Sequence, residues 1–316
     1  MSFANTKELL HKAQRGKYAV GHFNINNLEI LQGIVAAAEK LKSPVILSTS
    51  EGAIEYAGIS YLVALAKNAA EISGVPLALH LDHGRDLKII KQAIDLGYSS
   101  VMFDGSHLPF QENVKMTKQV VQWAHAKGIS VEAELGTIGG AEDLVSARKI
   151  LYTDPAQVQE FVKKTGCDFL AVAIGTSHGA YKFAGTAKLR LDILKEIRKR
   201  VKIPLVLHGA SGVSSSLIKE AEKYGAQLSG VSGVPDAQIK EAIKNGICKI
   251  NTDTDLRLAF DAAVRKVIMT QPKDFDPRHI LAPAREAIQK VAEERIRLFG
   301  SRQIHLNNSM VFHTKL

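Results

Sequence analysis

Eight apolar runs rich in β-branched residues recur along the chain, with segments of helical character between them. In order they are YAVGHF (18–23), PVILSTS (44–50), PLALHLDH (76–83), SVMFDG (100–105), SVEAELG (130–136), FLAVAIG (169–175), PLVLHG (204–209) and ICKIN (247–251). Nearly continuous apolar runs are typical of strands buried on both faces, as in a parallel sheet. Eight such alternations in about 250 residues predict an α/β fold of the (β/α)8 TIM-barrel type, with a doubly wound open sheet as the alternative.

The segments between the runs show the apolar spacing of about three to four residues that amphipathic helices have. Clear examples are residues 29–42, 87–98 and 113–128. A long glycine-led insertion at 139–157 follows the fifth run and has the length of a lid over an active site. The next helix is expected to begin near Asp154 and Pro155, a capping residue followed by a residue suited to the first helical position.

Two further additions to a minimal barrel are expected. An extra helix at 236–246 lies between the seventh and eighth runs, after a Gly/Ser-rich stretch at 229–235. A helix at 283–300 and a polar tail at 301–316 extend the C-terminus. We expect residues 1–316 to form a single catalytic domain.

Composition and charge exclude several classes of protein. No segment approaches the roughly eighteen consecutive apolar residues of a membrane span, and charged residues interrupt the start of the chain where a signal peptide is apolar. Cys167 and Cys248 lack a CxxC partner, so we expect buried thiols in a cytoplasmic protein. The net charge of +9 is spread along the helices without a dense basic run, which argues against nucleic-acid binding. A positive field suits a small anionic substrate such as a sugar phosphate.

Chemically active side chains follow six of the eight runs. They are Asp82 and His83 after the third, Asp104 after the fourth, Glu134 in the fifth, His178 after the sixth, His208 after the seventh, and Asn251 and Asp253 after the eighth. Because a barrel presents its reactive groups at the carboxyl ends of its strands, these side chains should meet at one mouth. Three imidazoles with further positions left open are typical of a catalytic zinc site, so His83, His178 and His208 are candidate ligands.

The carboxylates at this mouth have several candidate roles. Asp82 directly precedes a candidate ligand and is a candidate general acid/base, with helix capping as the alternative. Asp104 and Glu134 could bind a second cation or orient the histidines, and we favour orientation. Lys249 is the only lysine within a predicted strand that could form a Schiff base with a substrate, which would be an alternative to metal chemistry.

Three glycine-containing or polar loops follow the late strands and could bind phosphate through backbone N–H groups. They contribute Gly179 with Lys182, Gly209 with Ser211, and Asn251 with Thr254. Each glycine alone is more often an ordinary turn residue, so the prediction depends on their clustering. Arg257 and Arg278 could pair with a second phosphate or lie on a solvated surface.

Six motifs resemble those of the class II fructose-bisphosphate aldolase family. They are LHLDHG, DGSHLPFQEN, VEAELGTIGG, AIGTSHGAYKF, LVLHGASG and KINTDTDLRLAF, and the resemblance extends from about residue 5 to residue 302. It implies that His83, His178 and His208 hold a divalent metal, usually zinc. It further implies that Asp82 exchanges the proton of the substrate C4 hydroxyl, and that Glu142 in the insertion handles the proton at C3.

The resemblance also implies the remaining contacts with the substrate. Gly179, Gly209, Ser211, Asn251, Asp253 and Thr254 match positions around dihydroxyacetone phosphate, where Na⁺ or K⁺ often assists. Arg257 and Arg278 correspond to residues that reach the other phosphate from a neighbouring subunit, which implies a homodimer or homotetramer. The implied reaction is reversible cleavage of fructose 1,6-bisphosphate through a metal-stabilised enediolate, as in glycolysis and gluconeogenesis.

Three alternatives to this function stay open at this point. The HGASG motif is also similar to tagatose-bisphosphate aldolases, whereas Asp253 fits the fructose branch. A metal-dependent hydrolase on the same barrel would use the same ligands but not two phosphate sites. A non-catalytic binding protein on this barrel would be expected to lack Asp82 or one of the ligands, and all of these residues are present.

Overall fold

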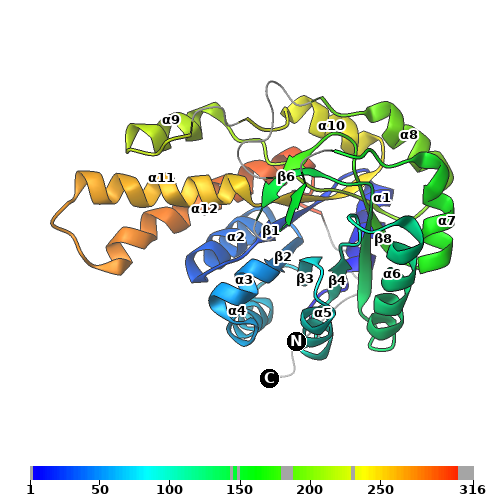
Figure 1. Cartoon of the computed structure of the whole chain (residues 1–316). Helices are drawn as coiled ribbons and strands as arrows, with labels where there is room; N and C mark the ends of the chain where they lie inside the picture. Colours follow the sequence, from blue (N-terminus) through cyan, green and yellow to red (C-terminus); the bar gives the residue numbers. More distant parts are fainter. Residues whose placement is uncertain (1–2, 143–144, 148–149, 179–187, 229–231, 305–316) are drawn as a thin grey trace.

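Eight parallel strands close into a barrel in the computed structural model of the chain, which describes residues 3–142, 145–147, 150–178, 188–228 and 232–304 (Figure 1). The barrel strands are β1 (Val20–Asn24), β2 (Val45–Ser50), β3 (Leu77–Gly84), β4 (Ser100–Phe103), β5 (Ser130–Leu135), β8 (Phe169–Val172), β10 (Leu205–Leu207) and β11 (Ile247–Thr252). Their order around the barrel is β1-β11-β10-β8-β5-β4-β3-β2. The TIM-barrel prediction is therefore confirmed, and the open-sheet alternative is wrong because the first strand pairs with the last.

Helices surround this barrel (Figure 1). Those described are α1 (Thr6–Gly16), α2 (Leu28–Leu41), α3 (Glu51–Ala57), α4 (Ile59–Ile72), α5 (Leu87–Asp95), α6 (Phe110–His125), α7 (Pro155–Thr165), α8 (Leu191–Arg200), α9 (Ser215–Lys223), α10 (Asp236–Lys244), α11 (Thr254–Thr270) and α12 (Pro277–Phe299). The expected helix before the eighth strand is α10, and α9 precedes it. The extra helix predicted between the seventh and eighth strands is thus present.

Side-chain caps fix where several helices begin. The Asp154 carboxylate accepts a hydrogen bond from the Ala156 amide, and Pro155 occupies the first turn of α7, as the sequence predicted. The same device begins the C-terminal helix earlier than predicted, at Pro277 rather than at residue 283. Asp276 accepts from the Arg278 amide there, and Pro283 is accommodated inside the helix. The cap at Asp276 therefore overrides the helix-breaking tendency of Pro283.

The apolar core has two main parts, separated by the wall of the barrel, and a small third cluster at Ala221, Ala226 and Ala262. The larger part lies between the outward faces of the strands and the surrounding helices. The smaller part fills the amino-terminal end of the barrel, where α1 packs across the opening, and includes Leu9, Leu10, Ala13, Val20, Ile46, Ala78, Met102 and Phe169. This end is closed by apolar packing, which leaves the carboxyl end for chemistry. Cys167 and Cys248 are buried free thiols, as expected.

The insertion after β5 forms a small second sheet. Strand β6 (Gly139–Glu142) pairs antiparallel with β7 (Val145–Ala147) and parallel with β9 (Ser177–His178). Gly139 lies opposite Ser177 and Gly140 opposite His178. The sequence predicted an insertion here but not this pairing, which joins two segments that follow different barrel strands. Within the described residues, no helix combines the length and apolarity that a membrane span requires.

Helices α11 and α12 extend together as an arm away from the barrel (Figure 1). Helix α12 packs closely on α2, and Gly33 of α2 lies at the point of contact. A Cβ atom at Gly33 would lie 2.7 Å from the carbonyl oxygen of Arg285 and 2.7 Å from Cγ2 of Ile288. The close approach of the two helices therefore requires the absence of a side chain at this position.

We predict that Gly33→Ala lowers the free energy of unfolding by about 1–3 kcal/mol, because the added methyl overpacks the contact between α2 and α12. Urea denaturation followed by circular dichroism measures this change. Gly74→Ala is the matched control, since no heavy atom lies within 4 Å of the added Cβ there. It should change stability by no more than about 0.5 kcal/mol. Equal stability of the two variants would show that the helix contact is not tight.

Candidate functional site

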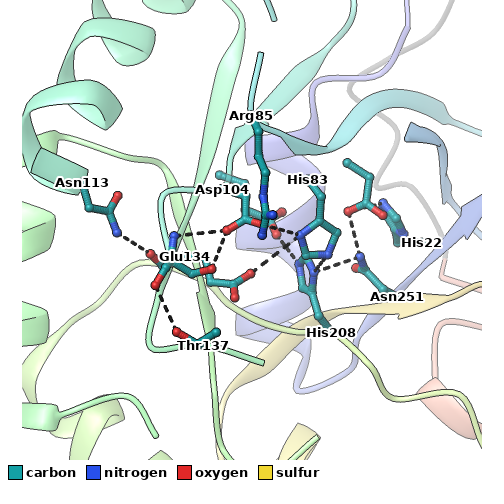
Figure 2. A network of polar contacts seen from close by, with 12 residues as sticks. His22, His83, Arg85, Asp104, Asn113, Glu134, Thr137, His208 and Asn251 are labelled. Atoms are coloured by element: carbon teal, nitrogen blue, oxygen red, sulfur yellow. Dashed lines mark hydrogen bonds and ion pairs between the residues drawn. The ribbon is translucent and has the colours of Figure 1, made fainter. Parts of the chain in front are cut away.

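Most of the predicted site residues that the structure describes lie at the carboxyl ends of the barrel strands. Asp82 and His83 end β3, Asp104 follows β4, His208 follows β10 and Asn251 lies near the end of β11. Figure 2 shows His83 and His208 facing each other, with Asp104 and Arg85 on one side and Asn251 on the other. Residues separated by more than a hundred positions are thereby brought into contact, as the barrel prediction required.

His83 and His208 form the centre of the site. The Nε2 atom of His83 lies 2.8 Å from Nδ1 of His208, and the two rings meet edge to face with their centroids 4.6 Å apart. The backbone of His83 is left-handed, with φ of 47°, a conformation that costs energy for a residue with a side chain. Such strained backbones cluster at functional sites, where the surrounding structure holds them in place.

A carboxylate contacts the far nitrogen of each ring. Oδ2 of Asp104 lies 3.2 Å from Nδ1 of His83, and Oε1 of Glu132 lies 2.6 Å from Nε2 of His208. Asp104 is in turn held by Arg85, whose Nη2 lies 2.8 Å from Oδ2. Histidines that bind metals usually have this arrangement, since an outer carboxylate fixes the tautomer and the ring orientation. The donor set therefore fits a divalent metal that prefers nitrogen ligands, such as zinc.

The protonation of the two rings follows from their surroundings. Burial acts to lower the pKa of His83, but Asp82 and the hydrogen bond to Asp104 outweigh it and raise the pKa to about 10. Burial, reinforced by the charge on His83, lowers the pKa of His208 well below its usual range. The two rings thus have opposite pKa shifts, although Nε2 of His83 and Nδ1 of His208 lie within hydrogen-bonding distance of each other.

Asp82 is held beside this pair by two amides. The Nδ2 atoms of Asn24 and Asn251 donate to its two oxygens at 3.2 and 3.0 Å. Nε2 of His22 lies 3.8 Å from Oδ1 of Asp82. The carboxylate is only 5% exposed and makes no cap to a following helix, because Asp86 caps α5. The capping alternative for Asp82 is therefore wrong.

Glu134 and Asp104 lie on the outer side of His83. Oε2 of Glu134 is 4.0 Å from Nδ1 of His83, and both carboxylates are buried. Burial and the nearby Asp104 raise the pKa of Glu134 well above its usual range. For Asp104 burial acts in the same direction, but the hydrogen bond and charge of His83 prevail and hold its pKa well below normal. The three residues are close enough together to contribute to a cation site.

Four predicted residues are described only in part or not at all. Glu142 ends β6 and His178 ends β9, so their backbones lie on adjoining strands of the small sheet. The side chains of both, and all of Gly179 and Lys182, lie outside the described residues. The small sheet brings the segment that carries Glu142 next to the segment that carries His178.

The predicted phosphate loops meet beside the start of α11. Gly209 adopts φ of 59°, and a Cβ there would lie 2.7 Å from the carbonyl oxygen of Ser177. Ser211 is buried in the following turn, which the Asp255 carboxylate holds by accepting from the amides of Gly212 and Val213 at 3.0 and 2.6 Å. Thr254 is the first residue of α11, where helix N-termini favour anions.

The two predicted arginines lie at different places. Arg257, on the first turn of α11, pairs with Asp253 at 2.7 Å. Arg278 lies on the first turn of α12, at the end of the arm away from the barrel, and its guanidinium is 85% exposed and paired with Asp276 (Figure 1). Arg257 thus lies near the phosphate loops, whereas Arg278 lies on a different helix and is exposed.

Several residues that shape the site were not predicted from the sequence. Asn24, Glu132 and Asp255 contact Asp82, His208 and the 211–213 turn respectively. Glu132 could have been found from the sequence. It lies two positions before Glu134 on the same predicted strand, so the two side chains point to the same face of the sheet. Asp255 stood within NTDTD without an assigned role, and only the fold shows that its carboxylate turns toward another loop.

Comparison with known proteins agrees with this geometry. A family model described as "Fructose-bisphosphate aldolase class-II" matches residues 4–228 and 226–303. A fructose-bisphosphate aldolase of Giardia intestinalis is 48% identical over 304 residues, which are 95% of this chain and 94% of the relative. One from Thermus caldophilus is 49% identical over 299 residues, covering 93% of this chain and 97% of the relative.

A solved structure agrees with the fold as well. The YdjI aldolase from Escherichia coli K12 superposes with a TM-score of 0.78 at 37% identity, covering 95% of this chain and 98% of that one. The family implies a divalent metal and a sugar bisphosphate substrate, and its members are aldehyde-lyases, so the non-catalytic alternative has no support. With its closed barrel, its paired histidines and these relatives, the chain belongs to the class II fructose-bisphosphate aldolase family.

Proposed function

We propose that this aldolase depends on zinc and reversibly cleaves fructose 1,6-bisphosphate to dihydroxyacetone phosphate and glyceraldehyde 3-phosphate in the cytoplasm. The observation that carries the proposal is the approach of Nε2 of His83 and Nδ1 of His208, with the Asp82 carboxylate held beside them. The relatives from Giardia intestinalis and Thermus caldophilus are named fructose-bisphosphate aldolases, which supports this substrate over tagatose bisphosphate.

In this proposal His83, His208 and His178 hold the metal. Asp104 and Glu132 support it by fixing the two described rings from behind. Glu134, beside Asp104, either strengthens that support or joins a second cation site, and we favour support. When bound, the metal acts as a Lewis acid for the negative charge that develops on the C2 and C3 oxygens of the substrate.

The protein side chains then move the protons. Asp82 accepts the proton of the C4 hydroxyl, the C3–C4 bond breaks, and C4 becomes the aldehyde carbon of glyceraldehyde 3-phosphate. The electron pair of that bond stays on the other half as an enediolate. Glu142 donates a proton to C3 and gives dihydroxyacetone phosphate. The roles reverse in condensation, and closure of the 139–157 segment would keep water from the enediolate.

The loops at the mouth provide for the two phosphates. The phosphate of the dihydroxyacetone half, with Na⁺ or K⁺ beside it, is bound by residues of the three loops: Gly179, Lys182, Gly209, Ser211, Asn251, Asp253 and Thr254. Arg257 and Arg278 contact the other phosphate. The position of Arg278 at the end of the arm supports its entering the site of a neighbouring subunit, and hence a homodimer or homotetramer.

The reaction and its stereochemistry are tested by one experiment. Triose phosphate release is measured from fructose and tagatose bisphosphates in parallel, with EDTA-treated protein and after zinc is restored. We expect no cleavage without metal and a strong preference for fructose once zinc is present. Equal or tagatose-biased rates would contradict the substrate, and release of inorganic phosphate in place of triose would identify a hydrolase.

Two substitutions separate proton transfer from metal binding. Asp82→Ala should lower turnover by about 10² to 10⁴ while the protein keeps its zinc, because a general acid/base is lost and no ligand is. His208→Ala should lose the metal itself. Turnover and zinc content, by a steady-state assay and elemental analysis, distinguish the two variants. Equal loss of zinc in both would show that Asp82 is assigned wrongly.

The end of the arm is tested by Arg278→Ala. We expect a higher Michaelis constant for the bisphosphate with little change in turnover, because a group that binds the phosphate is removed and no reacting group is. Lys273→Ala is the matched control, since it removes an exposed cation from the same end of the arm. An unchanged Michaelis constant for Arg278→Ala, or the same increase in both variants, would contradict the assigned role.

A further inference from the structure

A lysine and a glutamate are fully buried inside the barrel beneath the site. The side chains of Lys249 on β11 and Glu132 on β5 are both 0% exposed, and Nζ lies 2.9 Å from Oε2. Alternation along β11 places Lys249 on the same inward face as Asn251. Lys249 is therefore an interior cation directly below the residues that surround Asp82 and His208.

Lys249 contacts both halves of the site through one intermediate each. Its ammonium forms an ion pair with Oε2 of Glu132 at 2.9 Å, and the other oxygen of Glu132 lies 2.6 Å from Nε2 of His208. Nζ also donates to Oδ1 of Asn251 at 2.8 Å, while the amide nitrogen of Asn251 donates to Asp82 at 3.0 Å. Because the ammonium contacts both Glu132 and Asn251, these contacts argue against a role for Lys249 in Schiff-base chemistry.

The contribution of this ion pair to stability does not explain why it is buried inside the barrel. A buried ion pair can often be replaced by apolar side chains of similar volume without loss of stability, because desolvation offsets the attraction. Burial and the charge of Lys249 lower the pKa values of two other buried histidines, His22 and His80, well below the usual range. A charge pair at this depth is better explained by what it orients.

We propose that Lys249 and Glu132 are positioning residues that fix the tautomer of His208 and the amide orientation of Asn251. With its Oε2 held by the ammonium, Glu132 presents Oε1 as an acceptor, so His208 carries its proton on Nε2 and leaves the lone pair of Nδ1 facing His83. With its Oδ1 held by the same ammonium, Asn251 turns its amide nitrogen toward Asp82. A single buried cation thus orients a metal ligand and the partner of the acid/base.

This inference rests on the proposed function of His83 and His208 as ligands and is tested through zinc affinity. Zinc-loaded protein is titrated with a competing chelator, and ¹⁵N chemical shifts of His208 are recorded on the full chain after zinc is removed. Glu132→Gln keeps the shape, but its amide nitrogen can donate to His208 and move the proton to Nδ1. We expect zinc affinity to fall by about 10- to 100-fold and the shifts to report the other tautomer.

Three further variants distinguish positioning from a structural role. Lys249→Met alone should weaken both zinc affinity and thermal stability, because it leaves a buried carboxylate without its cation. The double variant Lys249→Met with Glu132→Gln should regain stability without regaining zinc affinity, and it decides the question if the single variant does not fold. Lys244→Met, which removes an exposed lysine on α10, should change neither property.

The outcomes separate this inference from the proposed function. If Glu132→Gln folds and binds zinc as the unaltered protein does, or if the double variant regains zinc affinity together with stability, the positioning role is wrong. If His208→Ala does not weaken zinc binding, the proposed metal site itself fails. An unchanged His208 tautomer in Glu132→Gln would overturn the inference independently of any metal.

Discussion

The pairing of β1 with β11 is the constraint on which the whole site depends. It joins the first and last strands of the barrel in register, with His22 opposite Asn251 and Val20 opposite Lys249. Without this closure Asn24 and Asn251, which lie at opposite ends of the sequence, could not both donate to Asp82 on β3. The same closure places Lys249 across the interior from Glu132 on β5. The chemistry is thus built on backbone hydrogen bonds between strands that are far apart along the chain.

The interior of the barrel changes character from one end to the other. Its amino-terminal end is filled by side chains such as Val20, Met102 and Phe169, which exclude water and are covered by α1. Toward the carboxyl end the inward positions become polar, with Glu132 and Lys249 fully buried. Apolar burial supplies most of the stability of a fold, whereas buried polar groups contribute mainly when every partner is in place. One end of the interior therefore stabilises the barrel, and the other orients the site.

The sequence allowed a good prediction of the strands and of where their ends meet. A nearly continuous apolar run has few alternatives to a buried parallel strand, so Asp82, His83 and His208 could be placed at one mouth. Contacts behind the reacting groups were harder to predict. Nothing in the local sequence around Glu132 or Asp255 names His208 or the 211–213 turn as the partner, because those contacts depend on strand register and loop path.

The start of α12 and the pairing within the insertion were also not predicted from the local sequence. Pro283 looked like the start of a helix, but the cap at Asp276 begins α12 earlier. The pairing of β6 with β9 joins two short segments with weak strand patterns, and it forms only because the barrel has already brought the ends of β5 and β8 together. Such contacts are consequences of tertiary structure, so local propensity carries little information about them.

The groups of the proposed site lie on two different sheets. Asp82, Glu132 and Asn251 lie on barrel strands, where the sheet fixes their backbones. His178 and Glu142 instead lie on β9 and β6, strands of the small sheet outside the barrel. Because β6 pairs directly with β9, the segment that carries Glu142 and the segment that carries His178 are joined by backbone pairing. In the proposed mechanism, the proton donor of the insertion and the third metal ligand therefore depend on the same two pairs of residues, Gly139 with Ser177 and Gly140 with His178.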